Sequence, residues 1–205
     1  MNALAELIQG TDEWRLARCG RATSSCFADI LAKGERKMRD KYLRRIVAER
    51  LTGKPIDGYR NAHMDRGNEQ EGDAREAYEI ATGNLIETVG FIPHEKLMAG
   101  CSPDGLIGTE GGGEFKCVIP TVQMETVLKG GFPTEHRAQI QGCLWITGRA
   151  WWDFCSYSPD LPERLSTYIF RVERDDRYIA TLAVEVEAFL KEADALYNQL
   201  IQKAA

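Results

Sequence analysis

The residues best suited to chemistry lie in two short segments near the middle of the chain, residues 102–104 (SPD) and 114–116 (EFK). On a β-strand, Glu114 and Lys116 are two residues apart and therefore point to the same face. Asp104 follows the preceding predicted strand, so a hairpin would bring it to the same end of the sheet. Two carboxylates suit Mg²⁺ or Mn²⁺, and a nearby lysine can orient water and stabilise charge on a phosphoryl group. The alternative is a solvated surface hairpin, and this pattern alone does not decide between the two.

Further polar residues could join this group. Glu71 lies in a predicted acidic helix and could supply a third carboxylate. Its neighbours Glu69 and Asp73 equally indicate a solvated helix face. Gln139 and Gln141 lie on a later predicted helix, and spacing selects neither of them.

Arg18, Ser25 and Ser102 could together bind a phosphate, although only the family resemblance described below selects them, and without it the residues favour the competing interpretation. Arg18 can contact a phosphate in a bidentate manner, and Ser25 and Ser102 offer hydroxyl donors. A helix start near Ser25 would add backbone N–H groups. Trp14, one helical turn before Arg18, could stack near a DNA end. The competing interpretation is a packed arginine, serines that cap or turn, and a core tryptophan.

The elements that must position these residues follow from hydrophobic periodicity and from turn residues. Helices are predicted over residues 11–19, 25–31, 37–51, 61–82, 121–130, 134–147 and 175–202. Strands are predicted over residues 85–92, 97–102, 113–119, 150–157 and 165–172, with turns at 103–105 and at the glycines 111–113. We expect an α/β (α+β) fold with a central mixed sheet flanked by helices. One domain would span 1–205, with N-terminal helices over 11–52, a core over about 61–172 and a C-terminal helix over about 175–202.

Charge is unevenly distributed. The net charge of −5 does not suggest nucleic-acid binding, but seven Lys or Arg residues lie between Lys33 and Arg45. This segment predicts contacts with a phosphate backbone, and a solvated helix face is the alternative. The residues expected to contact DNA are Lys37, Lys41, Arg44 and Arg45.

Composition excludes several classes of protein. No apolar run approaches the ~20 residues of a membrane-spanning helix. The N-terminus has no Lys or Arg before its apolar residues and carries Glu6, so we expect no secretory signal. The six cysteines form no C-x-x-C pair, which favours a reducing cytosol and predicts neither a zinc ribbon nor a disulfide framework. The three histidines, His63, His94 and His136, show no ligand spacing. The tryptophans Trp145, Trp151 and Trp152 are expected in the core.

Taken together, these segments resemble the PD-(D/E)XK nuclease superfamily, and more closely the phage-lambda-type exonucleases. The resemblance covers DEWRLARCGRATSS, RGNEQEGDAREAYE, CSPDGL, EFKC, KGGF, AQIQGCLWITG and the helix after RVERDDRYIA. By resemblance, Asp104, Glu114 and the carbonyl of Phe115 bind metal, Glu71 is the helical active-site glutamate, and Lys116 is the catalytic lysine. Gln139 matches the motif glutamine, and Arg18, Ser25 and Ser102 match residues that hold a 5′-phosphate.

The resemblance implies a Mg²⁺-dependent 5′→3′ exonuclease with a restriction-endonuclease-like core. It would digest one strand of linear duplex DNA to mononucleotides and leave a 3′ overhang, with two ions per site for which Mn²⁺ can substitute. It also implies a ring-shaped homotrimer, a phage single-strand annealing protein as partner, and a phage or prophage gene acting in the bacterial cytoplasm. Some relatives hold an iron–sulfur cluster, which the scattered cysteines argue against. The alternatives are a structure- or sequence-selective endonuclease and a non-catalytic DNA-end-binding recombination protein.

Overall fold

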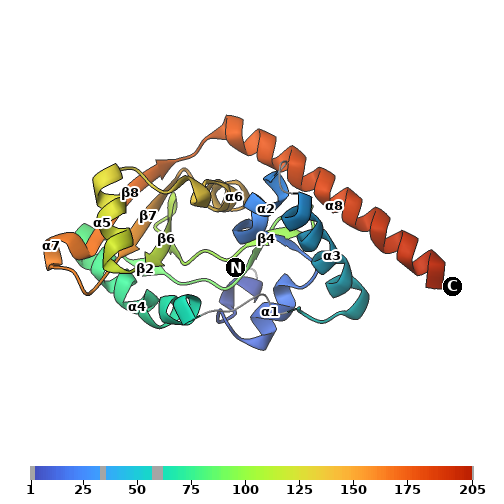
Figure 1. The fold of residues 1–205 in the computed structure, drawn as a ribbon, viewed down its shortest axis with the longest axis horizontal. Helices are drawn as coiled ribbons and strands as arrows, with labels where there is room; N and C mark the ends of the chain where they lie inside the picture. Colours follow the sequence, from blue (N-terminus) through green and yellow to red (C-terminus); the bar gives the residue numbers. More distant parts are fainter. Residues whose placement is uncertain (1–2, 33–35, 57–61, 205) are drawn as a thin grey trace.

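The computed structural model describes residues 3–32, 36–56 and 62–204, and Figure 1 shows their arrangement. The strands are β1 (Ala22–Thr23), β2 (Ile86–Glu87), β3 (Ile92–Pro93), β4 (Ala99–Cys101), β5 (Gly105–Ile107), β6 (Gly111–Cys117), β7 (Trp151–Tyr157) and β8 (Thr167–Glu173). The helices are α1 (Asp12–Arg18), α2 (Phe27–Leu31), α3 (Arg36–Thr52), α4 (Ala62–Thr82), α5 (Pro120–Lys129), α6 (Arg137–Thr147), α7 (Glu163–Ser166) and α8 (Asp176–Ala204). Short 3₁₀ segments are η1 (Ala3–Glu6), η2 (Ser24–Cys26) and η3 (Thr134–His136).

The strands form two mixed sheets. The larger sheet has the order β2-β5-β6-β7-β8, in which only β6 and β7 are parallel. The smaller sheet has the order β1-β4-β3, with β1 parallel to β4. The predicted α/β fold class is therefore confirmed, although two sheets take the place of the single central sheet.

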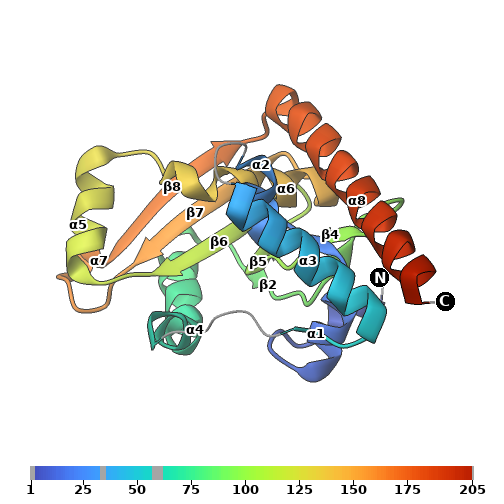
Figure 2. The same ribbon diagram turned by 45° about the vertical axis from the view of Figure 1, so that its right-hand side comes forward.

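Helices cover these sheets on both sides (Figures 1 and 2). Helix α4 packs against β6, β7 and β8, and its Tyr78 meets Phe115 edge-on with ring centroids 5.6 Å apart. Helix α6 buries Ile140 and Leu144 against Trp152 and its neighbours. The long α8 lies along α2 and α3. No helix among the described residues is long and apolar enough to cross a lipid bilayer.

The predicted strand over 85–92 is wrong, because this segment divides between the two sheets as β2 and β3. The residues between them pair with the N-terminal segment instead. The backbone N–H of Gly90 donates to Ala5 O at 2.8 Å, and that of Phe91 donates to Leu4 O at 3.0 Å. Long-range pairing of this kind outweighs the local preference for one continuous strand.

The glycines 111–113 are not a turn but the first residues of β6. Their role is close packing: a Cβ at Gly111 would lie 2.2 Å from the Trp151 ring, and one at Gly112 would lie 2.3 Å from the Trp152 ring. The turn is at residues 108–110, and the sequence reasoning missed β5 before it and α7 later. Trp152 is fully buried as expected, whereas Trp145 and Trp151 are half-buried.

Candidate active site

The tripeptide 102–104 and strand β6 bring three of the predicted chemical residues together. Asp104 lies between β4 and β5, and its Oδ2 accepts a hydrogen bond from Phe115 N at 2.8 Å. Glu114 and Lys116 share one face of β6, and the Lys116 ammonium forms an ion pair with Glu114 Oε1. The expected convergence of two carboxylates and an ammonium at one sheet is therefore present.

Glu114 is the most enclosed acid of this group, with a side chain that is 0% exposed. Its Oε1 also accepts a hydrogen bond from Gln139 Nε2 at 2.6 Å, so a side chain of α6 holds the carboxylate on β6. Its Oε2 is buried and has no hydrogen-bond partner among the described residues. A buried carboxylate oxygen without a partner is costly, and such an atom in a native site calls for an explanation such as an ion.

The two other carboxyl groups are strongly perturbed. Burial, reinforced by the negative charge of Glu114, raises the pKa of Asp104 to about 7. Burial, reinforced by the charge of Asp104, raises the pKa of Glu71 to about 7. Lys116 shows the opposite balance, because burial alone would lower its pKa, but Glu114 and Asp104 raise it above the usual value. The ammonium thus stays charged among acids that repel one another.

A divalent cation fits this set of residues. Among the described residues, no three His, Cys, Asp or Glu side chains are already grouped as metal ligands. The acids instead contact Lys116, the Phe115 N–H and Arg75, whose Nη1 donates to Glu71 Oε1 at 2.8 Å. The carboxylate oxygens are hard ligands of the kind that Mg²⁺ and Mn²⁺ prefer. Glu114 Oε2, which has no hydrogen-bond partner among the described residues, is free to bind such a cation. The Phe115 carbonyl as a ligand stays a prediction.

The predicted phosphate-binding residues also lie together, at the other end of the tripeptide. Arg18 Nη1 donates to Ser102 Oγ at 2.9 Å, and Nη2 lies 3.5 Å from Ser25 Oγ. Trp14 joins them: its Nε1 donates to Ser102 Oγ at 3.0 Å, and Arg18 Cζ lies 4.1 Å from its ring centroid. Burial lowers the pKa of Arg18, as expected for a cation withdrawn from water. We call Arg18, Ser25 and Ser102, together with Trp14, the phosphate-binding cluster after the prediction made for the first three; the binding of a phosphate there stays a prediction.

The basic segment divides into outward and inward side chains. Lys37, Lys41 and Arg44 are exposed on α3, as a contact with DNA requires. Arg45 turns inward: its Nη2 lies 3.4 Å from Cys26 Sγ, and its Cζ lies 4.8 Å from the Tyr42 ring centroid. Lys33 and Glu35, together with the side chains of Arg36, His63 and Glu69, lie outside the part of the chain that the structure describes.

Two residues of the site were missed from the sequence, Gln9 and Arg75. Both line a cavity of about 580 Å³, which is also lined by Glu71, Asp104, Trp14 and other residues of the N-terminal segment 5–10. Arg75 could have been found as the i+4 partner of Glu71 on one helix. No local sequence pattern identifies Gln9, because its hydrogen-bond partners, Val89 and Pro103, lie 80 and 94 residues away in the sequence.

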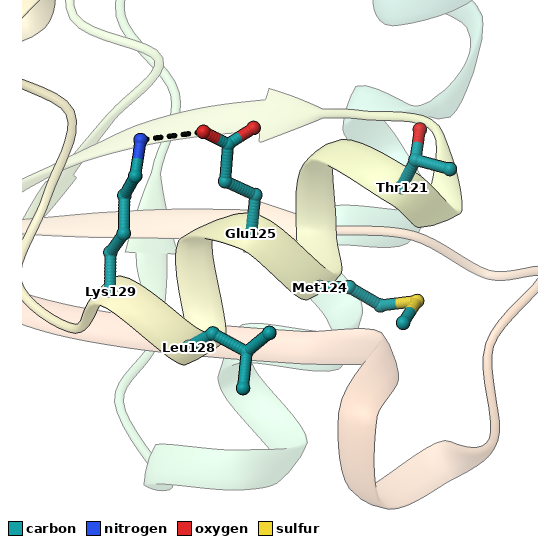
Figure 3. Close-up of a pocket in the computed structure, with 5 residues that line it drawn as sticks. All are labelled: Thr121, Met124, Glu125, Leu128 and Lys129. Atoms are coloured by element: carbon teal, nitrogen blue, oxygen red, sulfur yellow. Dashed lines mark hydrogen bonds and ion pairs between the residues drawn. The ribbon is translucent and has the colours of Figure 1, made fainter.

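A different hollow, of about 520 Å³, lies on the surface of α5 (Figure 3). It is lined by Thr121, Met124, Glu125, Leu128 and Lys129, with an ion pair of 2.5 Å between Glu125 and Lys129. It includes none of the residues that the sequence selected for chemistry. The cavity lined by Glu71 and Asp104, in contrast, includes residues that the sequence selected.

The cysteines, His136 and Gln141 have contacts of their own outside the carboxylate group. All six cysteines are free thiols. His136 stacks on Phe154 with ring centroids 5.5 Å apart, and burial together with Lys116 lowers its pKa to about 4. Gln141 bonds the backbone at Glu173 and Asp175 and so has a structural role.

Comparison with known proteins agrees with this geometry. A sequence profile of the YqaJ-like viral recombinase domain matches residues 13–150, more than half of the chain. The solved structure of the alkaline exonuclease LHK-Exo from Laribacter hongkongensis is similar, with a TM-score of 0.89 and 40% identity over 95% of this chain and 98% of that one. The same enzyme in complex with dAMP aligns equally well.

Two more distant proteins are also similar. A phage-related exonuclease from Haemophilus somnus 129PT shares the fold, with a TM-score of 0.65 and 14% identity over 90% of this chain and 96% of that one. ExoD of Escherichia coli (strain K12) is 29% identical over 68 residues, 32% of this chain and 77% of that protein. The resemblance to phage-lambda-type exonucleases is confirmed, and the chain belongs to the YqaJ-like viral recombinase family.

Proposed function

We propose that this protein is a Mg²⁺-dependent 5′→3′ exonuclease that digests one strand of linear duplex DNA to mononucleotides and leaves a 3′ overhang. One observation carries the proposal. Ser102 belongs to the phosphate-binding cluster and Asp104 to the carboxylate group, and only Pro103 separates them. A terminal phosphate and a nearby phosphodiester bond are the two groups that such a site would bind together.

The phosphate-binding cluster accounts for the preference for an end. A terminal 5′-phosphate carries more charge than an internal phosphodiester and offers more oxygens to a guanidinium. Arg18 is already held toward Ser25 and Ser102, so a phosphate would replace these serine contacts without a large movement of the arginine. Such preorganisation favours binding, because little side-chain freedom is lost.

The carboxylate group accounts for hydrolysis. Glu71, Asp104 and Glu114 would hold Mg²⁺, which when bound would activate water and stabilise the leaving oxygen. Lys116 keeps its proton among these acids, so its charge is available to stabilise the negative charge that grows on the phosphoryl group. Gln139 fixes the orientation of Glu114 through its hydrogen bond to Oε1.

The relatives support the same activity. LHK-Exo is an alkaline exonuclease, and the resemblance covers nearly the full length of both chains. For this protein we also propose a second ion in the site, with Mn²⁺ able to substitute, and no iron–sulfur cluster.

The family resemblance also suggests an oligomeric state, a partner and a cellular location for this protein. We expect a ring-shaped homotrimer that acts with a phage single-strand annealing protein in the bacterial cytoplasm. The exposed Lys37, Lys41 and Arg44 would contact the DNA backbone, which lets an acidic protein bind DNA through a local excess of positive charge.

The test compares linear duplex with 5′-phosphate, linear duplex with 5′-hydroxyl and covalently closed circles, each with Mg²⁺ and with EDTA. Lys116→Ala serves as the inactive control. Loss of one strand from linear DNA only, faster from phosphorylated ends and abolished by EDTA, supports the exonuclease. Cleaved circles would instead favour an endonuclease. Binding of DNA ends without any metal-dependent cleavage would leave a recombination scaffold.

A further inference from the structure

The side chain of Gln9 connects two loops that are distant in sequence. Its Nε2 donates to Val89 O at 2.8 Å and to Pro103 O at 2.8 Å. Pro103 is the central residue of the tripeptide that joins the phosphate-binding cluster to the carboxylate group. One amide group thus contacts the backbone midway between the two halves of the site.

Pro103 depends on this contact more than another residue would. It is buried and has no backbone N–H, so its carbonyl is the only backbone group that can anchor it by a hydrogen bond. Buried carbonyl oxygens are almost always paired. Among the described residues Gln9 is the side chain that pairs with this one.

Each residue of the tripeptide is held by a different element. Trp14 and Arg18, from α1, donate to Ser102 Oγ. Arg75, from α4, lies 3.2 Å from Asp104 O, while the Phe115 N–H of β6 donates to Asp104 Oδ2. Gln9 supplies the remaining contact, at the centre. The tripeptide is therefore fixed at three successive residues.

The segment that carries Gln9 is itself anchored. Gly90 N donates to Ala5 O and Phe91 N to Leu4 O, so the N-terminal residues run beside the 89–91 loop. The approach is close, because a Cβ at Gly90 would lie 2.2 Å from Leu7 O. Gln9 can act as a support because the segment that carries it is hydrogen-bonded to this loop at residues 4 and 5.

We propose that Gln9 is a positioning residue that couples recognition of the 5′-phosphate to cleavage, by fixing the Ser102–Asp104 tripeptide between the two halves of the site. This inference rests on the proposed function. With Gln9 in place, a phosphate bound at Ser102 sets the position of the scissile bond relative to Asp104. Without it, the two half-sites can shift relative to one another, and binding of the phosphate no longer places the bond for attack.

The test uses Gln9→Glu, which keeps the shape of the side chain but replaces its two N–H donors by a carboxylate that repels both carbonyl oxygens. Gln202→Glu, the same change at an exposed position near the end of α8, is the matched control. The readout is the ratio of kcat/KM for 5′-phosphorylated over 5′-hydroxyl linear duplex. The fraction of folded enzyme cancels in this ratio, so a merely structural defect would leave it unchanged.

We expect Gln9→Glu to lower this ratio at least fivefold, mainly through kcat on phosphorylated ends, with the control equal to wild type. A ratio that stays at the wild-type value overturns the proposal, however much the total rate falls. Hydrogen exchange of the Phe115 amide gives a readout that needs no activity: it should quicken in Gln9→Glu and not in Gln202→Glu. Unchanged exchange would refute the positioning role of Gln9, whereas wild-type enzyme that fails to cut linear DNA would refute the proposed function instead.

Discussion

Replacing Lys116 by methionine removes the ammonium that faces a fully buried carboxylate. Methionine preserves most of the volume and apolar length of the lysine side chain. In the variant, Glu114 keeps the hydrogen bond from Gln139 at 2.6 Å but loses its ion pair, while its Oε2 is already unpaired among the described residues. We therefore expect Lys116→Met to destabilise the metal-free protein as well as abolish cleavage.

The magnitude follows from the geometry of the pair. Removing one partner of a buried ion pair costs about 3–5 kcal/mol. Here the Lys116 side chain is 31% exposed, and Gln139 still pairs with the carboxylate, so we expect a smaller loss than for a fully buried pair, about 2–3 kcal/mol. For a chain of this length, 1 kcal/mol lowers Tm by about 2–4 °C, which gives a drop of about 8 °C.

The assay is thermal and urea unfolding in EDTA of four proteins: wild type, Lys116→Met, Glu114→Gln and the double variant. The double variant should recover at least half of the loss, because no charge is then left without a partner, yet it should stay inactive. Lys129→Met, which breaks the exposed Glu125–Lys129 pair on α5, should leave Tm unchanged. A double variant no more stable than Lys116→Met would refute the reasoning, as would a Lys116→Met protein that melts with wild type.

Three further predictions concern the same site. Arg18→Ala should remove the preference for 5′-phosphorylated ends while leaving Mg²⁺ affinity, measured by calorimetry, at the wild-type value; an unchanged preference would show that the phosphate-binding cluster is misassigned. Gln139→Leu should lower Mg²⁺ affinity or kcat about 10–100-fold by freeing Glu114, and equal activity would place Gln139 outside the machinery. In the metal-free protein, Asp104 and Glu71 have their pKa values raised to about 7 from 3.8 and 4.5, so the folded state binds more protons than the unfolded state between about pH 4 and 7. The free energy of unfolding in EDTA should therefore fall as pH rises through that window, whereas Mg²⁺ affinity should rise with pH. Denaturant titrations would check the first slope and calorimetry the second. The control is the double variant Asp104→Asn/Glu71→Gln, whose free energy of unfolding should lose this dependence on pH.

The local part of the site could be predicted from the sequence. The side-chain period of a strand places Glu114 and Lys116 on one face, and a short hairpin brings Asp104 to them, so three residues within 13 positions determine the convergence. Helix periodicity likewise places Arg18 and Trp14 one turn apart, although only the resemblance to a family selected Arg18 for phosphate binding. Glu71 and Gln139 lie on helices whose placement depends on packing across the sheet, and only the resemblance to a family selected them.

Two predictions of local structure were wrong, and both errors also arise from contacts between residues distant in sequence. The glycines 111–113 suggested a turn because glycine is common in turns, yet here Gly111 and Gly112 on β6 leave room for the rings of Trp151 and Trp152 on β7. The strand over 85–92 divided because residues near the N-terminus took the hydrogen bonds of Gly90 and Phe91. Both features depend on partners at least 40 positions away, and no local pattern of hydrophobicity encodes them.

The division of the chain into these two groups of residues bears on how end selectivity arises. The carboxylates and Lys116 belong to the tripeptide 102–104, to β6 and to α4, which form the sheet and its covering helix. Most of the residues that would hold the terminal phosphate, or that contact the tripeptide next to it, lie between Gln9 and Ser25. Under the proposed function, hydrolysis belongs to the core and the choice of a 5′ end belongs to the N-terminal segment. Substitutions that alter end preference without loss of metal binding should therefore fall in residues 9–25 and at Ser102, whereas substitutions at Glu71, Asp104 and Glu114 should remove cleavage of every substrate alike.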